Sequence, residues 1–119
     1  MHWWDKPVRA LQFNIEDPYG FYADRIDAEG LVRVAERVNA NLLVVFARDA
    51  WGRVYYRGSR LYPRHHNSAL DVGELVERAR GKGIRVVVMV AHTANRYLYR
   101  LHPSWAQRTR EGEVIVLEH

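Results

Sequence analysis

Two continuous apolar runs limit the fold of this chain more than any other feature: residues 42–47 (LLVVFA) and residues 84–91 (IRVVVMVA). Both runs are short and rich in β-branched residues, which favours strands over helices. A strand that is apolar at successive positions is covered on both faces, which is typical of a parallel sheet. Residues 8–15 (VRALQFNI) suit a further strand ahead of them.

Helical patterns fill the intervals between these strands. Asp27 is an N-cap candidate, and an apolar stripe with helical spacing follows it and ends near residues 39–41. A capping box at residues 71–74 (DVGE) begins a second stripe, which Gly81 or Gly83 ends. The predicted core-facing positions are Leu31, Val34, Ala35 and Val38 in the first helix, and Val72, Leu75, Val76 and Ala79 in the second.

The order strand, helix, strand, helix, strand predicts an α/β fold with about three parallel strands and two flanking helices. Two architectures share this order, an open doubly wound sheet and a partial (β/α) barrel. The sequence has no glycine-rich nucleotide-binding motif that would support the open sheet. We expect residues 1–116 to form a single domain, because residues 117–119 (LEH) resemble the junction that an expression vector adds before a histidine tag.

Composition narrows the possible partners and locations. The formal net charge is +4, but Lys and Arg are scattered without a basic tract, which makes nucleic acid a weak candidate partner. No apolar run approaches the roughly 18 residues of a membrane span, and no signal peptide is visible. Cysteine is absent, which fits a reducing compartment and slightly favours the cytoplasm.

Irregular segments follow the second and third strands, at residues 51–70 and 92–105. Loops of this length are usually functional or disordered, and their aromatic content argues against disorder. We expect a short strand at residues 54–56 and one helical turn within residues 92–105. Residues 114–116 either open another strand or are a frayed end.

Polar and aromatic residues gather just after the predicted strands, and both parallel architectures bind ligands at the carboxyl ends of their strands. Sugars present flat C–H faces that stack on aromatic rings, and hydroxyls that pair with carboxylates, amides, Arg and His. This mixture therefore predicts a carbohydrate site. The expected substrate-binding residues are Glu16, Arg48, Asp49, Trp51, Tyr55, His92 and Asn95.

Most of these residues also have a simpler interpretation. Arg48 and Asp49 could form an ion pair that locks a loop, and Trp51 and Tyr55 could pack that loop onto the sheet. Glu16 could cap or solvate a loop.

We expect no cofactor and no metal site. Adjacent histidines such as His65 and His66 rarely bind one ion together, and no HxH or HExxH spacing occurs. Both residues are expected in the loop before the second helix, where they could still contact a ligand.

Five segments occur in a recognisable order: RALQFN, RVNANLLVVFA, DAWGRVYYRGSRLYP, LDVGELVERARGKGIRVVVMV, and HPSW at residues 102–105. Together they resemble the N-terminal part of a glycoside-hydrolase-like (β/α) barrel. The nearest resemblance is to the hypothetical glycosyl hydrolases, which are similar to the α-L-fucosidase and β-galactosidase-type barrels. The resemblance extends from about residue 4 to residue 113.

This resemblance implies a chain that supplies only part of an enzyme. A complete barrel takes about 250 residues, and the catalytic carboxylates of such enzymes usually follow the fourth and later strands. In fucosidase-like barrels the second strand leads to two His and an Asp that bind the sugar. Here Asp49 matches the acidic position, and Ala47 and Arg48 replace the histidines.

The sequence therefore predicts the carbohydrate-binding N-terminal portion of a glycoside hydrolase, inactive by itself. Its expected partners are a carbohydrate and either the remainder of the barrel or a second copy in a homo-oligomer. One alternative is a self-contained α/β binding or oligomerisation domain without catalysis. Another is a basic nucleic-acid-binding domain that uses Arg and aromatic stacking.

Overall fold

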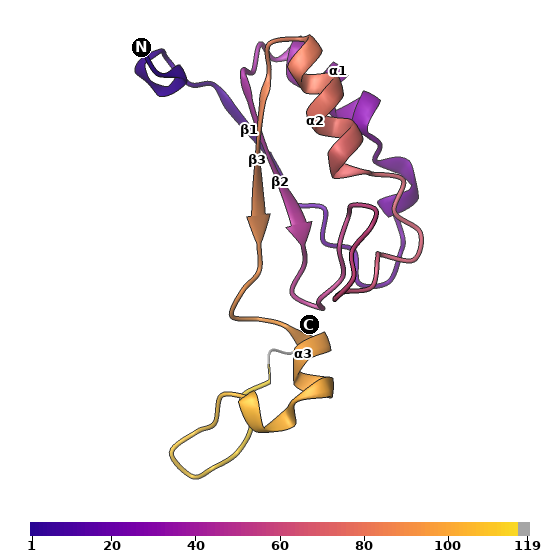
Figure 1. Cartoon of the computed structure of the whole chain (residues 1–119), viewed down its shortest axis with the longest axis vertical. Coiled ribbons are helices and arrows are strands. Elements are labelled where there is room, and N and C mark those ends of the chain that lie inside the picture. Colours follow the sequence, from indigo (N-terminus) through magenta and orange to yellow (C-terminus); the bar gives the residue numbers. More distant parts are fainter. Residues whose placement is uncertain (117–119) are drawn as a thin grey trace.

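The computed structural model of the chain describes residues 1–116, so the predicted tag remnant at residues 117–119 lies outside the described residues. Its centre is one parallel sheet with the strand order β1-β2-β3 (Figure 1). The strands are β1 (Ala10–Phe13), β2 (Leu42–Arg48) and β3 (Arg85–Val90), and the helices are α1 (Ala28–Arg37), α2 (Val72–Gly81) and α3 (Arg96–Leu101). Short 3-10 turns occupy Trp3–Asp5, Ala23–Arg25 and Pro103–Trp105.

The winding of the chain distinguishes between the two predicted architectures. Each strand pairs with the next one in sequence. Helices α1 and α2 pack on each other along the same side of the sheet (Figure 1). A doubly wound sheet reverses its strand order and carries helices on both faces, whereas a (β/α) barrel winds in one direction. The α/β class with three parallel strands is confirmed, and its winding is that of a partial barrel.

Helix α1 begins where the sequence predicted, but a different stripe faces the core. The Asp27 carboxylate accepts a hydrogen bond from the Gly30 N–H at 2.7 Å, which confirms the N-cap. Val34 and Val38 are 42% and 56% exposed, so their predicted core positions are wrong. The buried stripe lies three positions earlier with the same spacing, and its members are Ala28, Leu31, Val32 and Ala35. All four belong to the hydrophobic core cluster.

Helix α2 matches the prediction more fully. The Asp71 carboxylate caps it by accepting from the Glu74 N–H at 3.1 Å, and Val72, Leu75 and Ala79 are buried. The Glu74 side chain pairs with Arg78 at 2.7 Å.

Strand β2 extends one residue past its predicted run, to Arg48, whereas β3 and β1 are shorter than predicted. Strand β1 differs most. It covers four of the eight predicted positions, because hydrogen bonds to side chains interrupt the ladder at both ends. The Arg9 N–H donates to Asn41 Oδ1, and the Glu16 N–H donates to Asn14 Oδ1. Ile15 lies beyond β1 but is still buried in the core.

Strand β3 forms an edge of the sheet. Val87, Val88 and Val90 are 40%, 45% and 49% exposed. Since β2 covers only one edge of β3, the other carries unpaired backbone groups in the described part of the chain.

Residues 92–116, here called the arm, extend past the carboxyl ends of the strands (Figure 1). The expected helical turn is present as α3 and the 3-10 turn after it. Residues 114–116 contribute one antiparallel bridge, between Val114 and Arg108. The arm elongates the molecule: the radius of gyration is 16.6 Å, against about 13.5 Å for a compact chain of this length.

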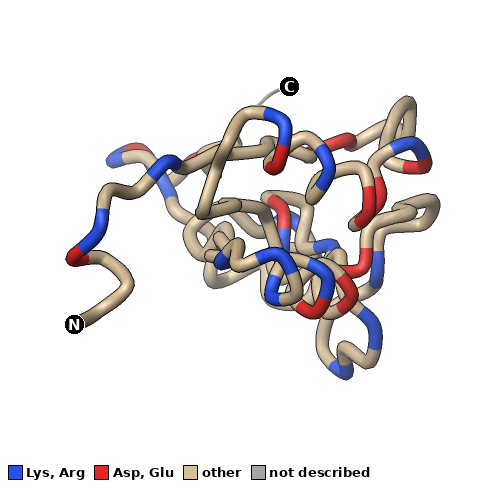
Figure 2. The backbone as a smooth tube through the Cα atoms, turned by 90° about the horizontal axis from the view of Figure 1, so that it is seen from above, with Lys and Arg blue, Asp and Glu red and all other residues tan. Residues whose placement is uncertain are grey.

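Charges of both signs alternate along the backbone without separating into two regions (Figure 2). Among residues 1–116, the helices fall short of the length and apolarity that a membrane span requires.

Candidate functional site

Asp49, the first residue after β2, organises the loop beyond that strand. It is fully buried. Its Oδ1 accepts the backbone N–H groups of Trp51 and Arg53, both at 3.0 Å. Its Oδ2 accepts from Arg53 Nη2 at 2.8 Å, from Arg53 Nε at 3.0 Å and from the Tyr55 hydroxyl at 3.0 Å. The carboxylate therefore fixes a tight loop and is not available to a ligand in this structure.

Arg48 does not pair with Asp49, so the predicted ion pair is wrong. Neighbouring residues at a strand end point to opposite faces. Arg48 places its guanidinium 4.6 Å from the centre of the Tyr62 ring, and its Nη2 donates to the carbonyl of Ala91 after β3. Its Nε is buried without a hydrogen-bond partner among residues 1–116.

Tyr55 lies in the core, not on the rim. Its side chain is fully buried, and its hydroxyl donates to Asp49 with the Ile15 carbonyl 3.3 Å away. Burial, reinforced by the negative charge of Asp49 and the hydrogen bond to it, raises the pKa of the Tyr55 phenol. The ring is covered by protein and cannot stack on a sugar in this arrangement.

Arg53 links two rim loops, and it was not among the predicted site residues. Besides its ion pair with Asp49, its guanidinium donates to the carbonyls of Pro18 at 3.2 Å and Asp17 at 3.4 Å. Gly52, with φ of +80°, makes the turn that brings residues 49 and 53 together. The signal in the sequence was an Asp and an Arg four residues apart, separated by a glycine.

The loop after β1 is built around a second buried carboxylate. Asp17 is 1% exposed and accepts four backbone N–H groups at 2.8–3.0 Å. Burial raises the pKa of Asp17, but the four hydrogen bonds outweigh it and lower the pKa to about 2. The donors are Gly20, Phe21, Tyr22 and Ala23.

His65 braces the same loop from the long segment before α2. Its Nε2 lies 2.7 Å from the Asp17 carbonyl, and its Nδ1 accepts from the Asn67 N–H at 3.4 Å. This pattern requires the neutral ring with the proton on Nε2, and burial lowers the pKa of His65. The ring stacks on Tyr55 and on His66, so His65 has a structural role here.

Glu16 connects the first two loops directly. Its Oε1 accepts from the Ala50 N–H at 3.3 Å, next to the Asp49 turn. The side chain is partly buried, so it serves as a bridge between loops.

The arm contacts the segment after β2 through a backbone hydrogen bond and through the edge-to-face contact of the Tyr97 and Tyr62 rings. The Arg96 N–H donates to the Ala50 carbonyl at 3.0 Å. A Cβ added to Gly52 would lie 2.4 Å from Tyr97 Cβ and 2.7 Å from Asn95 Oδ1, so only glycine permits this approach. Asn95 also caps α3, since its Oδ1 accepts from the Leu98 N–H.

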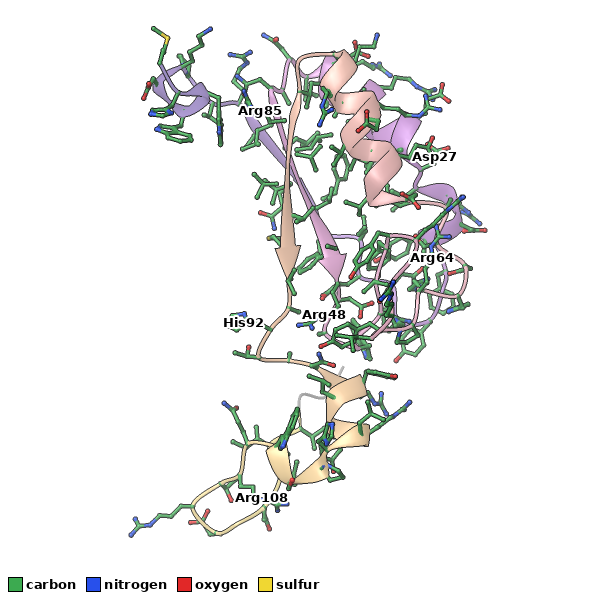
Figure 3. The ribbon with its side chains drawn as sticks, in the orientation of Figure 1. Asp27, Arg48, Arg64, Arg85, His92 and Arg108 are labelled. Atoms are coloured by element: carbon green, nitrogen blue, oxygen red, sulfur yellow. The ribbon has the colours of Figure 1, made fainter. Side chains whose placement is uncertain are left out.

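A pocket of about 870 Å³ opens between the arm and the loops that follow the strands. Figure 3 shows His92 just past β3 and above the arm, with Arg48 nearby at the end of β2. The aromatic residues of the lining are Tyr19, Trp51, Tyr99 and Trp105, and its polar ones are His92, Thr93, Asn95, Arg96 and Gln107.

The structure divides the seven predicted site residues into two groups. Trp51, His92 and Asn95 line the pocket. The other four, Glu16, Arg48, Asp49 and Tyr55, lie behind it and hold the loops. Within residues 1–116, no group of three or more His, Asp or Glu side chains could hold a metal ion.

Comparisons with known proteins place the chain in a family. The family model described as "Hypothetical glycosyl hydrolase 6" matches residues 27–119. Among solved structures, α-L-fucosidase isoenzyme 2 from Paenibacillus thiaminolyticus is similar, with a TM-score of 0.73 and 18% identity. That match covers 90% of this chain and 16% of the fucosidase, and at this identity it shows the fold alone.

The search of curated proteins found no match. The family model nevertheless covers most of the sequence, including α1, β2, α2, β3 and the arm. This chain therefore belongs to the hypothetical glycosyl hydrolase 6 family.

Proposed function

We propose that this chain is the N-terminal portion of a glycoside hydrolase and that it holds a sugar in the pocket between the strand ends and the arm. The observation that carries the proposal is the lining, in which aromatic rings and polar groups share one pocket at the carboxyl ends of parallel strands. Sugars need this combination of flat apolar surface and hydrogen-bonding groups. Family membership supports the same reading.

In this proposal one set of residues contacts the sugar, and a second set fixes the loop that carries Trp51. Trp51 offers a stacking surface, and His92 and Asn95 meet the sugar hydroxyls. Arg53, Asp49 and Tyr55 act through the loop that carries Trp51, because their hydrogen bonds fix its backbone.

We also propose that the chain by itself does not hydrolyse glycosides. Hydrolysis with either stereochemical outcome uses two carboxyl groups that flank the scissile bond. Asp17 and Asp49 are buried and their oxygens are occupied by protein donors. Glu16 bridges two loops through Ala50. The catalytic pair is then expected from further strands of a larger parent enzyme.

Binding can be tested by NMR titration of the ¹⁵N-labelled chain with glucose, galactose and fucose. We expect shifts at the indole of Trp51 and at the amides of residues 92–98. Trp51→Ala and His92→Ala should each weaken binding about tenfold or more while leaving the melting temperature within about 3 °C of the parent. Trp4→Ala is the matched control, since Trp4 is 58% exposed and does not line the pocket.

If no sugar shifts any of these resonances, the binding proposal fails. Turnover of aryl glycosides by the isolated chain would contradict the proposed inactivity.

A second candidate is an oligomerisation unit, which the exposed valines of β3 favour. An open apolar strand edge invites pairing with another chain. Sedimentation velocity at rising concentration should reveal a dimer or larger species, and a strict monomer at high concentration would count against it.

A further inference from the structure

We infer that the pocket selects an acidic sugar, one that carries a carboxylate or a sulfate group. This inference rests on the proposed carbohydrate-binding function and narrows it to a substrate class. Among the described residues that line the pocket, the ionisable side chains that carry or can gain positive charge are Arg96 and His92, and none is Asp or Glu. An acidic sugar would therefore meet no like charge in the wall.

The nearby carboxylates face away from the pocket. Asp49 is fully buried against Arg53 and Tyr55. Asp17 is enclosed by four backbone N–H groups. Glu16 is committed to Ala50 and does not line the pocket. The rim thus contains acidic side chains, but their carboxylate oxygens accept hydrogen bonds from groups of the protein.

Arg96 supplies hydrogen-bond donors to the pocket, whereas Thr93 and Gln107 of the lining can donate and accept. Arg96 forms no ion pair within residues 1–116. Asn95 has its Oδ1 taken by the Leu98 N–H, while its Nδ2 is buried and has no hydrogen-bond partner among the described residues. An ionised carboxylate or sulfate is a pure acceptor, so it pairs with the charged donors of Arg96 more strongly than a neutral hydroxyl does.

Arg48 adds positive charge behind the wall. Its guanidinium reaches the carbonyl of Ala91, the residue before His92. Asp49 pairs with Arg53, which leaves the charge of Arg48 unmatched by an ion pair in the described residues. The positive charge of Arg48 therefore lies next to the β3 end of the pocket.

The experiment compares matched sugars that differ only in the group at C6, which is neutral in one member of each pair and acidic in the other. Calorimetric or NMR titrations would use glucose against glucuronate, galactose against galacturonate, and glucose against glucose 6-sulfate, at low and high NaCl. We expect an acidic member to bind at least tenfold more tightly than its neutral partner, with a preference that shrinks as salt rises. The carboxylate and sulfate pairs show which acidic group is recognised.

Arg96→Gln should remove most of this preference, because it weakens binding of the acidic sugars far more than binding of their neutral partners. Arg100→Gln is the matched control, because Arg100 lies on the same short helix but does not line the pocket. Equal binding of acidic and neutral sugars would overturn the inference while leaving the proposed function intact. Binding of neutral sugars alone would also overturn it. Binding of no sugar at all would overturn both.

Discussion

Asp49→Asn is the sharpest test of how the candidate site is built. The substitution keeps the shape of the side chain but removes the charge that Arg53 and Tyr55 share. The amide oxygen can still accept hydrogen bonds from the backbone N–H groups of Trp51 and Arg53. It then presents an N–H₂ group to the guanidinium, so donors face donors.

The magnitude follows from burial. Removing one partner of a buried ion pair costs about 3–5 kcal/mol. Since the Arg53 side chain is 16% exposed and keeps two carbonyl acceptors, we take the lower end, ~3 kcal/mol. An unfolding entropy of about 2.1 cal/mol/K per residue, over 119 residues, is ~0.25 kcal/mol/K. The melting temperature should therefore fall by ~12 °C.

Differential scanning calorimetry of the variant and the parent measures this fall. Glu29→Gln is the control, because its pair with Arg33 is 3.6 Å long and both side chains are 65% exposed. That loss should be below ~0.5 kcal/mol, or ~2 °C. An Asp49→Asn protein that melts within ~3 °C of the parent would refute the account of the loop. Additive effects of Asp49→Asn and Arg53→Gln in a double-mutant cycle would refute their pairing.

Two further predictions concern the rim. Gly52→Ala should loosen the arm, because the added Cβ would lie 2.4 Å from Tyr97 Cβ. Hydrogen exchange in residues 92–105 should therefore become faster. Gly58→Ala is the control, because Gly58 has the same φ of +80° but no neighbour within 4 Å, and it should leave exchange in the arm unchanged. The pKa of Asp17 falls from 3.8 to about 2 on folding, so its ionised form stabilises the fold above pH 3.8 by about 2 kcal/mol. That stabilisation should disappear as pH falls through this range towards 2, and an Asp17→Asn protein should lose this part of the acid dependence of its melting temperature.

Periodicity and caps predicted the main strands and helices, whereas the short strand expected at residues 54–56 is present only as isolated bridges at Val54. Strands β2 and β3 were predicted because β-branched runs of this length favour strands. Asp27 and Asp71 were found because a short acidic side chain before an apolar stripe is the usual start of a helix. The buried face of α1 was predicted wrongly because two stripes with the same spacing overlap on that helix, and alanine is only weakly hydrophobic.

The site was harder to predict because residues that contact each other across a loop show no regular spacing in the sequence. The sequence indicates Asp49 as a site residue, and adjacency alone favours Arg48 as its ion-pair partner. The true partner, Arg53, becomes close only through the turn at Gly52. Tyr55 was placed on the rim because an aromatic residue beside polar ones resembles a binding surface, while in the structure its hydroxyl satisfies a buried carboxylate. Trp51, His92 and Asn95 line the pocket as residues that follow parallel strands are expected to do.

The consecutive strand order also affects how this polypeptide can be made. Strands β1 and β2 and the helix between them all precede residue 49, and β3 adds beside β2 without passing between existing strands. A nascent chain leaving the ribosome can therefore assemble its first βαβ unit before α2 has emerged. At that stage Asp17 can already be enclosed by its own loop. Asp49, by contrast, stays exposed to solvent until Arg53 and Tyr55 emerge.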